Sequence, residues 1–500
     1  MLINVSRPST ALPLHGPAAS RLIEQRAQAA LPPHTLMRRA GLAVARLALA
    51  LAPHARRVWI AAGPGNNGGD GFEAALHLQA TGKDVRVAFA GDAAKLPADA
   101  ADALARAQAA GVRIGSDAAP DLGAHDLAID ALLGIGASRA PQGRVAELAA
   151  ALNALACPVL AVDVPTGLDA PTGQPLGDAC VRGAHTLSLL SLKPGLYTGQ
   201  GRDFAGRVWF DDLGVDASAA PPDAWLVGAD AIARAPRSHA RHKGSFGDVA
   251  VVGGAPGMTG AALLAARAAH AAGAGRVFVS LLEPDLPAQQ MALDPARPEL
   301  MFRGAWWQSA PEVIAASTVV AGCGGGDAVR LVLPRLLSLA ARLVLDADAL
   351  NAIAADAGLQ TQLAARARRG HATVLTPHPL EAARLLGAEA AGVQANRLHA
   401  AHTLADRFGC VVVLKGSGTV IAEPGRAPHI NPTGNAALAT AGTGDVLAGW
   451  IGGLWAAESP SGAGFDVAIA AVYRHGAAAD ATSVTPLRAA DLVDAMLAVS

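Results

Sequence analysis

The stretch Ala441-Gly442-Thr443-Gly444-Asp445-Val446-Leu447-Ala448-Gly449 places two glycines and a carboxylate directly before an apolar helical run. The glycines allow a tight turn and leave backbone N–H groups uncovered at the start of the predicted helix. Such a helix start carries about half a positive charge and is a good anion site. A carboxylate there can take a proton from a hydroxyl group while a phosphoryl group arrives. The stretch therefore predicts a phosphoryl-transfer site, and an Asp that only stabilises the helix start is the alternative.

Length and charge limit the class of protein. Five hundred residues allow two or three domains. Lys+Arg 40 against Asp+Glu 41 gives a net charge of -1, which offers no basic surface for nucleic acid or an anionic membrane. Apolar runs are broken before membrane-spanning length, and the first twenty residues lack the pattern of a secretory signal. Four scattered cysteines without metal-ligand spacing indicate a reduced, cytoplasmic protein: Cys157, Cys180, Cys323 and Cys410.

Both halves of the chain alternate short apolar runs with alanine-rich helical stretches, which is the pattern of parallel sheets covered by helices. In the first half we expect strands at 57–62, 84–90, 127–131 and 158–162, and helices at 71–81, 98–110 and 144–156. In the second half we expect strands at 248–252, 276–281, 318–322, 342–346, 372–376 and 410–415. A segment rich in Ala, Pro and Asp, residues 214–223, separates the halves. The sequence therefore predicts one α/β domain over residues 1–218 and another over 224–500.

Polar loops follow three strands of the first half. The loop Gly63-Pro64-Gly65-Asn66-Asn67-Gly68-Gly69-Asp70-Gly71 lacks both Gly-x-Gly-x-x-Gly spacing and a Walker lysine, which counts against a generic nucleotide loop. Its two asparagines suit a hydrated cation or a sugar-phosphate, with a tight structural turn as the alternative. Asp130 and Asp163 each stand at a strand end, and each alone could be an ordinary turn residue. Three polar loops at one sheet edge favour a ligand site.

These loops, with Leu36-Met37, Ala40-Gly41 and the run Asp163-Val164-Pro165-Thr166-Gly167-Leu168-Asp169, resemble the NAD(P)H-hydrate epimerase family, the YjeF N-terminal domain, over about residues 15–215. The resemblance implies a Rossmann-like αβα fold, Asp163 as the acid/base residue, and a potassium ion held by Asn67, Asp130 and Thr166. Oxygen ligands of these types suit a hard cation. The residues implied to hold the hydrated dinucleotide are Asn66, Asn67, Gly68, Gly69, Asp70, Gly134, Ile135, Gly136, Ala137, Ser138, Arg139, Ala140 and Asp163.

Strand ends in the second half also carry polar groups. Asp346 and Asp348 follow one predicted strand, and His378 follows the next between two prolines, which stiffen its backbone as a ligand contact would need. A surface or capping histidine is the alternative. Lys415-Gly416-Ser417-Gly418-Thr419 ends a further strand in a basic turn that suits a nucleotide phosphate or ribose.

His242-Lys243-Gly244, the segment Thr376-Pro377-His378-Pro379-Leu380-Glu381 and residues 435–449 resemble the ribokinase-like ATP/ADP-dependent NAD(P)H-hydrate dehydratase family, the YjeF C-terminal domain, over about residues 225–500. The resemblance implies a second αβα domain with Asp445 as the catalytic base. It implies ADP as co-substrate with Mg²⁺. It places the hydrated dinucleotide at Ala262, Gly325, His378 and Asp445, and the adenine nucleotide at Lys415, Gly416, Ser417, Gly418, Thr419 and Gly444. Cys323 stands where the family usually has proline.

The two domains in this order resemble the fused repair enzymes of bacteria, in which an isomerase and a lyase act together. The expected substrates are NADHX or NADPHX, together with ADP, and the resemblance leaves a homo-oligomer open. No nucleic acid or membrane partner is expected. One alternative is a small-molecule kinase with a nucleotide-sensing domain, for which a persistent phosphorylated product would be evidence. Another is a first half that binds without catalysing, which Asp163→Asn would distinguish.

Overall fold

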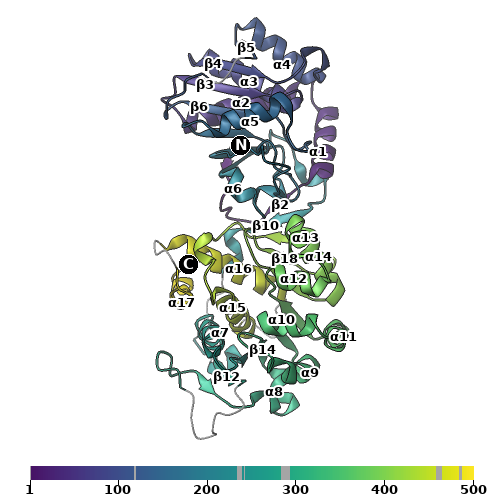
Figure 1. Cartoon of the computed structure of the whole chain (residues 1–500), viewed down its shortest axis with the longest axis vertical. Helices are drawn as coiled ribbons and strands as arrows, with labels where there is room; N and C mark the ends of the chain where they lie inside the picture. The colour runs from purple at the N-terminus through teal and green to yellow at the C-terminus, as the bar shows by residue number, and fades with distance from the viewer. Residues whose placement is uncertain are drawn as a thin grey trace. The chain divides into compact units, whose positions relative to one another are not determined.

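The computed structural model describes residues 2–116, 120–233, 239–240, 242–282, 293–457, 464–482 and 487–499. The chain forms two compact units. The first comprises Met1–Pro8 and Leu12–Leu226, and the second comprises Ser9–Ala11 and Val227–Ser500. Each is an α/β unit with helices on both faces of a mostly parallel sheet (Figure 1). The fold class predicted from the sequence, two three-layer αβα domains, is therefore confirmed.

The sheet of the first unit has the order β1-β9-β8-β7-β6-β3-β4-β5, and only β1 runs antiparallel to its neighbour. The strands are β1 (Ile3–Asn4), β3 (Arg57–Ala62), β4 (Asp84–Phe89), β5 (Arg113–Gly115), β6 (Leu127–Ala131), β7 (Val159–Val162), β8 (His185–Leu189) and β9 (Arg207–Asp211). Strands β2 (Leu12–Leu14) and β10 (Ala224–Leu226) pair antiparallel. The chain order reverses between β3 and β6, which is where open α/β sheets place their ligands.

Helices bury both faces of this sheet. They are α1 (Pro17–Ala30), α2 (Thr35–Leu51), α3 (Asn66–Ala80), α4 (Ala98–Ala109), α5 (Gly143–Asn153) and α6 (Gly201–Ala205). Alternate residues of β3 face opposite ways: Val58 and Ile60 belong to the core beneath α2, α3 and α4, while Trp59 belongs to the core beneath α5. A strand buried on both faces is apolar throughout, which explains why the apolar runs predicted this sheet well.

The start of α3 differs from the prediction. The helix begins at Asn66, whereas the sequence pattern predicted a loop up to Gly71, so that prediction was wrong by five residues. Gly68 and Gly69 belong to the first turn of this helix, where the lack of a side chain lets neighbouring segments pack closely against it. A Cβ on Gly68 would lie 2.0 Å from the carbonyl oxygen of Gly63, and one on Gly69 would lie 2.7 Å from the terminal methyl carbon of Met37. Glycine therefore serves tertiary contact here, which helix propensity alone does not predict.

The sheet of the second unit runs β13-β12-β11-β14-β15-β16-β17 in parallel and continues through the antiparallel strands β18 and β19. The strands are β11 (Asp248–Gly253), β12 (Arg276–Leu281), β13 (Met301–Phe302), β14 (Thr318–Ala321), β15 (Arg342–Leu345), β16 (Ala372–Leu375), β17 (Val411–Leu414), β18 (Val420–Ala422) and β19 (His429–Ile430). The six longer parallel strands lie within one or two residues of the predicted positions.

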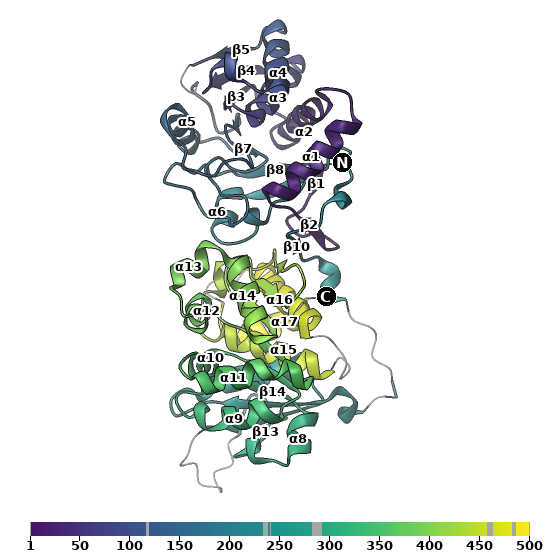
Figure 2. The same cartoon turned by 90° about the vertical axis from the view of Figure 1, so that its right-hand side faces the viewer.

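Two helical layers cover the second sheet. One comprises α7 (Thr259–Ala271), α15 (Thr443–Ala457), α16 (Gly464–Ala481) and α17 (Ala489–Ala498). The other comprises α8 (Pro311–Ala316), α9 (Val329–Leu339), α10 (Ala347–Ala354), α11 (Ala357–Ala365), α12 (Pro379–Leu386), α13 (Ala390–Ala395) and α14 (Arg397–Phe408), several of which are visible together in Figure 2. Within the described residues, no helix is both long and apolar enough to cross a membrane.

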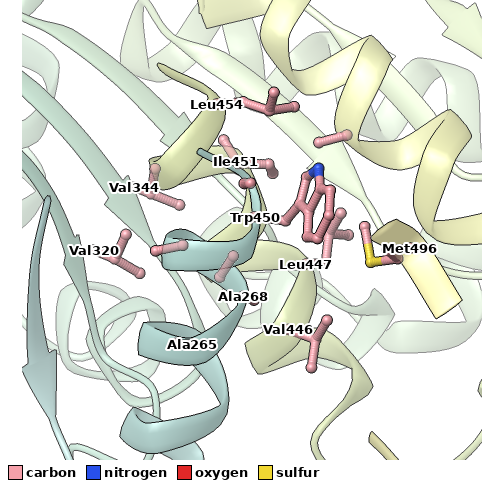
Figure 3. Packing of buried hydrophobic residues seen from close by; sticks show 14 of the residues in the cluster. Ala265, Ala268, Val320, Val344, Val446, Leu447, Trp450, Ile451, Leu454 and Met496 are labelled. Carbon is pink, nitrogen blue, oxygen red and sulfur yellow. The ribbon is translucent and has the colours of Figure 1, made fainter. Parts of the chain in front are cut away.

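Helix α15 is held in place by close contact with α7 and with the sheet. A Cβ on Gly449 would lie 2.0 Å from the carbonyl oxygen of Ala265, and one on Gly453 would lie 2.2 Å from that of Ala269. Figure 3 shows the same helix placing Trp450 beside Met496, with Val320 of the sheet in the same cluster. Because these contacts leave little freedom, the first turn of α15, which carries Asp445, has a defined position over the strand ends.

Candidate functional sites

A cavity of about 810 Å³ opens at the carboxyl ends of β3, β6 and β7 in the first unit. Most of the predicted dinucleotide-binding residues line it: Asn66, Asn67, Asp70, Gly134, Ile135, Gly136, Ala137, Ser138, Arg139, Ala140 and Asp163. Gly68 and Gly69 are buried within the first turn of α3 and are not among the lining residues. The sequence motifs from three loops thus meet at one site.

Asp163 stands at the end of β7 with a positive φ of 67°, a conformation uncommon for a residue with a Cβ. One carboxylate oxygen accepts a hydrogen bond from the ammonium of Lys193, and the other accepts from the backbone N–H of Ile135 at 3.2 Å. The ammonium also donates to the carbonyl oxygens of Leu189 and Ser191, each at 2.8 Å. The Lys193 side chain is only 2% exposed. Sequence analysis missed this buried partner, since thirty residues separate the two.

Two further carboxyl groups line the same cavity. Burial, together with the nearby charge of Asp163, raises the pKa of Asp70 well above its usual range and raises the pKa of Glu24 as well. Glu24 comes from α1, a helix that the sequence analysis did not include in the site. The cavity therefore combines one buried cation with carboxyl groups that differ in proton affinity, an arrangement suited to moving protons.

Of the three residues predicted to hold a cation, Asn67 lines this cavity, whereas Asp130 and Thr166 are not among its lining residues. The hydroxyl of Thr166 donates to Asp130 at 2.7 Å, and the backbone N–H of Thr166 donates to the same carboxylate at 2.8 Å. Both residues are fully buried, and burial raises the pKa of Asp130 to about 6. The amide nitrogen of Asn67 is buried without a hydrogen-bond partner. The hydrogen bonds to the buried Asp130 carboxylate come from neutral groups, Leu132 and Thr166, so a positive charge is missing and a hard cation fits the site.

The second unit gathers polar groups at the ends of β15, β16 and β17. Asp346 accepts hydrogen bonds from the ammonium of Lys415 at 2.7 Å and from the hydroxyl of Thr376 at 2.8 Å, both at the same oxygen. Glu381 lies 4.0 Å from the Lys415 nitrogen, and burial raises the pKa of Glu381 to about 7. Burial alone would lower the pKa of Lys415, but Asp346 and Glu381 raise it. The ammonium therefore stays charged inside the site.

Asp445 joins this group from the first turn of α15. Its carboxylate oxygen, an oxygen of Asp346 and the sulfur of Cys323 all lie within 4.8 Å of one another. Burial and the charge of Asp346 raise the pKa of Asp445 to about 6, while the Cys323 thiol and Lys415 act in the opposite direction. Gly442 has φ of 90°, and a Cβ on Gly444 would lie 3.2 Å from the Lys415 nitrogen. The predicted anion-binding turn thus faces Lys415.

His378 caps helix α12. Its Nδ1 accepts from the backbone N–H groups of Leu380 at 3.2 Å and Glu381 at 3.4 Å, while its Nε2 lies 3.2 Å from a carboxylate oxygen of Glu381. Burial and Lys415 lower the pKa of His378. Its side chain is 46% exposed and can still meet a ligand.

The predicted nucleotide turn, residues 415–419, follows β17, with Gly416 and Ser417 exposed. Buried Arg397 supports it by donating to the carbonyl oxygens of Leu414 and Lys415 at 3.1 and 3.2 Å. Sequence analysis missed Arg397, because it lies on a helix 18 residues before the turn.

Two residues predicted to contact the substrate, Ala262 and Gly325, have no polar side chain to offer a ligand. Ala262 has a fully buried side chain in α7, where a Cβ on Gly254 would lie 3.0 Å from its methyl group. Gly325 lies in the loop after β14, where its N–H donates to the carbonyl oxygen of Gly322 at 3.0 Å. The structure thus offers backbone atoms, but no side chain of Ala262, to a ligand here.

Each of the two units matches a known protein family. A family model described as YjeF-related protein N-terminus matches residues 33–195, and one described as NAD(P)H-hydrate dehydratase matches residues 249–497. The bifunctional NAD(P)H-hydrate repair enzyme Nnr of Escherichia coli (strain K12) is 37% identical over 462 residues, covering 89% of this chain and 85% of the relative. The enzyme of the same name from Coxiella burnetii is 36% identical, covering 89% and 90%.

Among solved structures, the ADP/ATP-dependent NAD(P)H-hydrate dehydratase of Bacillus subtilis, co-crystallised with ATP/Mg²⁺, is 30% identical. The match covers 53% of this chain and 93% of the Bacillus subtilis chain, with a TM-score of 0.43. The full-length relatives match across both units, in the same order. The chain therefore belongs to the family of bifunctional NAD(P)H-hydrate repair enzymes.

Proposed function

We propose that the chain repairs hydrated nicotinamide dinucleotides in two steps. The first unit interconverts the (R) and (S) epimers of NADHX or NADPHX. The second dehydrates the (S) epimer to NADH or NADPH at the expense of ADP, giving AMP and phosphate. The observation that carries this proposal is that each unit has its own acid/base site, in which a lysine ammonium contacts a carboxylate at the end of a parallel strand. Four free, buried cysteines support a cytoplasmic location.

In the first unit, Asp163 takes the proton from the C6 hydroxyl of the substrate and later returns it. The ring bond from nitrogen to C6 opens and closes again on the other face, so that C6 is inverted. Lys193 keeps the Asp163 carboxylate oriented and balances its charge, since the ammonium contacts it directly. Asn66 to Asp70 and Gly134 to Ala140 would hold the dinucleotide along the cavity.

Potassium suits the group formed by Asn67, Asp130 and Thr166, because these residues can supply amide, carboxylate and hydroxyl oxygens and the Asp130 carboxylate is fully buried. When bound there, the ion supplies the positive charge that the buried carboxylate lacks. Thr166 also accepts from the backbone N–H of Leu133 at 2.9 Å, so this group holds the start of the loop that carries Gly134.

In the second unit, Asp445 takes the proton from the C6 hydroxyl as the terminal phosphoryl group of ADP arrives. Lys415 and the N–H groups of the Gly442–Gly444 turn stabilise the negative charge on that phosphoryl group. The phosphorylated carbinol then loses phosphate with help from the ring nitrogen and a proton from C5, which restores the dihydronicotinamide. His378 and the backbone near Ala262 and Gly325 would contact the dinucleotide, and residues 415–419 with Gly444 the adenine nucleotide.

Magnesium fits this site through the second carboxylate oxygen of Asp346, since the hydrogen bonds from Lys415 and Thr376 both go to the first. Magnesium usually takes one or two carboxylates and completes its shell with substrate phosphates and water. When bound, the ion supplies charge neutralisation at the ADP phosphates.

The direct test is to incubate the protein with both NADHX epimers and to follow dihydronicotinamide absorbance with ADP, with ATP and without nucleotide. Complete recovery of NADH that depends on ADP and releases phosphate is the expected result. Asp163→Asn should limit recovery to the share of the (S) epimer plus the slow spontaneous exchange. Asp445→Asn should abolish recovery while epimer exchange continues. A phosphorylated product that persists would instead identify a kinase, and no NADH with any nucleotide would contradict the dehydratase.

A further inference from the structure

Helix α16 holds the segment that leads into the catalytic turn of the second unit. The hydroxyl of Thr433 donates to the carbonyl oxygen of Tyr473 at 2.8 Å, and the N–H of Gly434 donates to the carboxylate of Asp480 at 2.8 Å. Both acceptors belong to α16. Helix α16 therefore anchors the start of the segment that leads from residue 433 to residues 442–445.

His475 is the member of α16 that reaches the turn itself. The residue is 9% exposed, and its Nε2 lies 3.0 Å from the carbonyl oxygen of Thr443. A carbonyl oxygen only accepts, so Nε2 carries the proton and donates. Burial, with a further effect of Lys415, lowers the pKa of His475 to about 4, so the ring is neutral near neutral pH. The function proposed above leaves this buried group without a role.

The hydrogen bond acts on one particular peptide plane. The carbonyl group of Thr443 and the N–H group of Gly444 belong to the same planar unit, and in the trans form they point in opposite directions. At the first residues of a helix, the carbonyl groups point toward the helix C-terminus. The N–H groups point toward the N-terminal end, where they have no partner within the helix. Holding the Thr443 oxygen therefore sets the direction of the Gly444 N–H.

That N–H belongs to the residue that faces the charged groups of the site. A Cβ on Gly444 would lie 3.2 Å from the Lys415 nitrogen and 3.9 Å from the free carboxylate oxygen of Asp346. The Thr443 hydroxyl is engaged elsewhere, with the carbonyl oxygens of Leu438 and Thr440 at 2.9 Å each. Those bonds fix the side chain of Thr443 and do not involve its carbonyl oxygen, which is the atom that His475 binds.

We propose that His475 is a positioning residue for phosphoryl transfer: by binding the Thr443 carbonyl it aims the Gly444 N–H at the phosphoryl group that ADP delivers. This inference rests on the dehydratase activity proposed for the second unit. A preorganised N–H donor acts mainly when charge develops in the transition state, so its loss lowers kcat more than it raises KM.

The test compares side chains at position 475 in the full chain. His475→Leu keeps the volume and removes the donor. His475→Gln places an amide nitrogen the same number of bonds from the backbone as Nε2, and His475→Asn places it one bond short. Val472→Ala is the matched control, because it creates a small void beside the same core of α16 without touching the turn. Epimerisation by the first unit serves as an internal control in every variant.

His475→Leu should lower the dehydratase kcat about 10²-fold, the usual cost of one such donor, with KM for ADP and (S)-NADHX changed by less than about threefold. His475→Gln should recover most of that loss, while Val472→Ala should lower only the melting temperature. Amide exchange at residues 442–446 should accelerate in the Leu variant and not in the control.

A dehydratase kcat of a folded His475→Leu variant within about threefold of the wild type would overturn the inference. If that variant does not fold, the comparison of Gln with Asn decides. Gln should be about tenfold faster than Asn, and equal rates would overturn the inference. Failure of the wild type to form NADH with either ADP or ATP contradicts the proposed function instead, so the two failures are distinguishable.

Discussion

The buried pair of Asp163 and Lys193 allows a quantitative test of the first unit. Lys193→Met keeps the chain length and removes the ammonium. This leaves the Asp163 carboxylate and the carbonyl oxygens of Leu189 and Ser191 without their shared donor. The Lys193 side chain is 2% exposed and that of Asp163 is 12% exposed, so water replaces the lost bonds poorly. Breaking one partner of such a pair costs about 3–5 kcal/mol.

That free-energy cost corresponds to a measurable increase in the population of unfolded forms. Since about 1.4 kcal/mol corresponds to a tenfold change in an equilibrium constant, unfolded forms of the first unit should become roughly 100- to 4,000-fold more populated. Hydrogen–deuterium exchange of the full chain reports this, because peptides from β6, β7 and β8 follow the first unit and peptides from β14, β15 and β16 follow the second. The second set should stay unchanged.

The double variant Lys193→Met with Asp163→Asn separates charge from packing. It removes the uncompensated carboxylate, so most of the lost protection should return even though epimerisation stays abolished. Acceleration of less than about tenfold in the single variant would refute the reasoning, because the ammonium would then contribute little to the fold. Equal exchange in the single and double variants would refute it too, since the cost would then come from packing.

Five further results are expected. Asp445→Asn should lower dehydratase kcat about 10²-fold or more without changing epimerisation, as NADH absorbance will show. Because the pKa of Asp445 lies at about 6 and the base must be ionised, dehydratase kcat/KM should fall as pH drops through about 6. Cys323→Ala should move that midpoint upward in the pH–rate profile, because the thiol lowers the pKa of Asp445. Potassium should raise the melting temperature of the first unit above that in choline, and Asp130→Asn should remove the difference. Gly449→Ala should destabilise the second unit by about 1–3 kcal/mol in thermal unfolding, because the added methyl would meet the oxygen of Ala265 at 2.0 Å.

Most strands of both sheets were predictable because their residues are buried on both faces and form unbroken apolar runs. Strand β8 shows the limit of this rule. It carries Thr186 and Ser188, both fully buried, whose hydroxyls donate to the carbonyl oxygens of Ala205 and Ser191. Buried hydroxyls cost little when such acceptors exist, but the acceptor of Thr186 lies 19 residues away along the chain. The sequence pattern did not identify this strand.

The residues that carry charge or a proton at each site were predictable where they stand in a loop that follows an apolar run. Asp163 and Lys415 have this signal, and Asp445 has a different one, a glycine-rich turn directly before an apolar helical run. Lys193, Arg397 and His475 have neither, because each acts on a residue between 18 and 32 positions away along the chain. A single lysine or arginine in a sequence is predicted to lie at the surface. Only the structure shows that these side chains are buried against a particular partner.

The sequence by itself determined the class of each unit, the order of its strands along the chain, and the glycine-rich turns that open onto each strand edge, because these depend on local periodicity and on backbone freedom. Only the tertiary structure decided that the glycines at 68 and 69 lie inside a helix, that Lys193 lies against Asp163, and that His475 holds the peptide before Gly444. Those arrangements depend on burial and on contacts between segments that are distant along the chain. Such contacts contribute free energy only in the folded state, where the segments lie together.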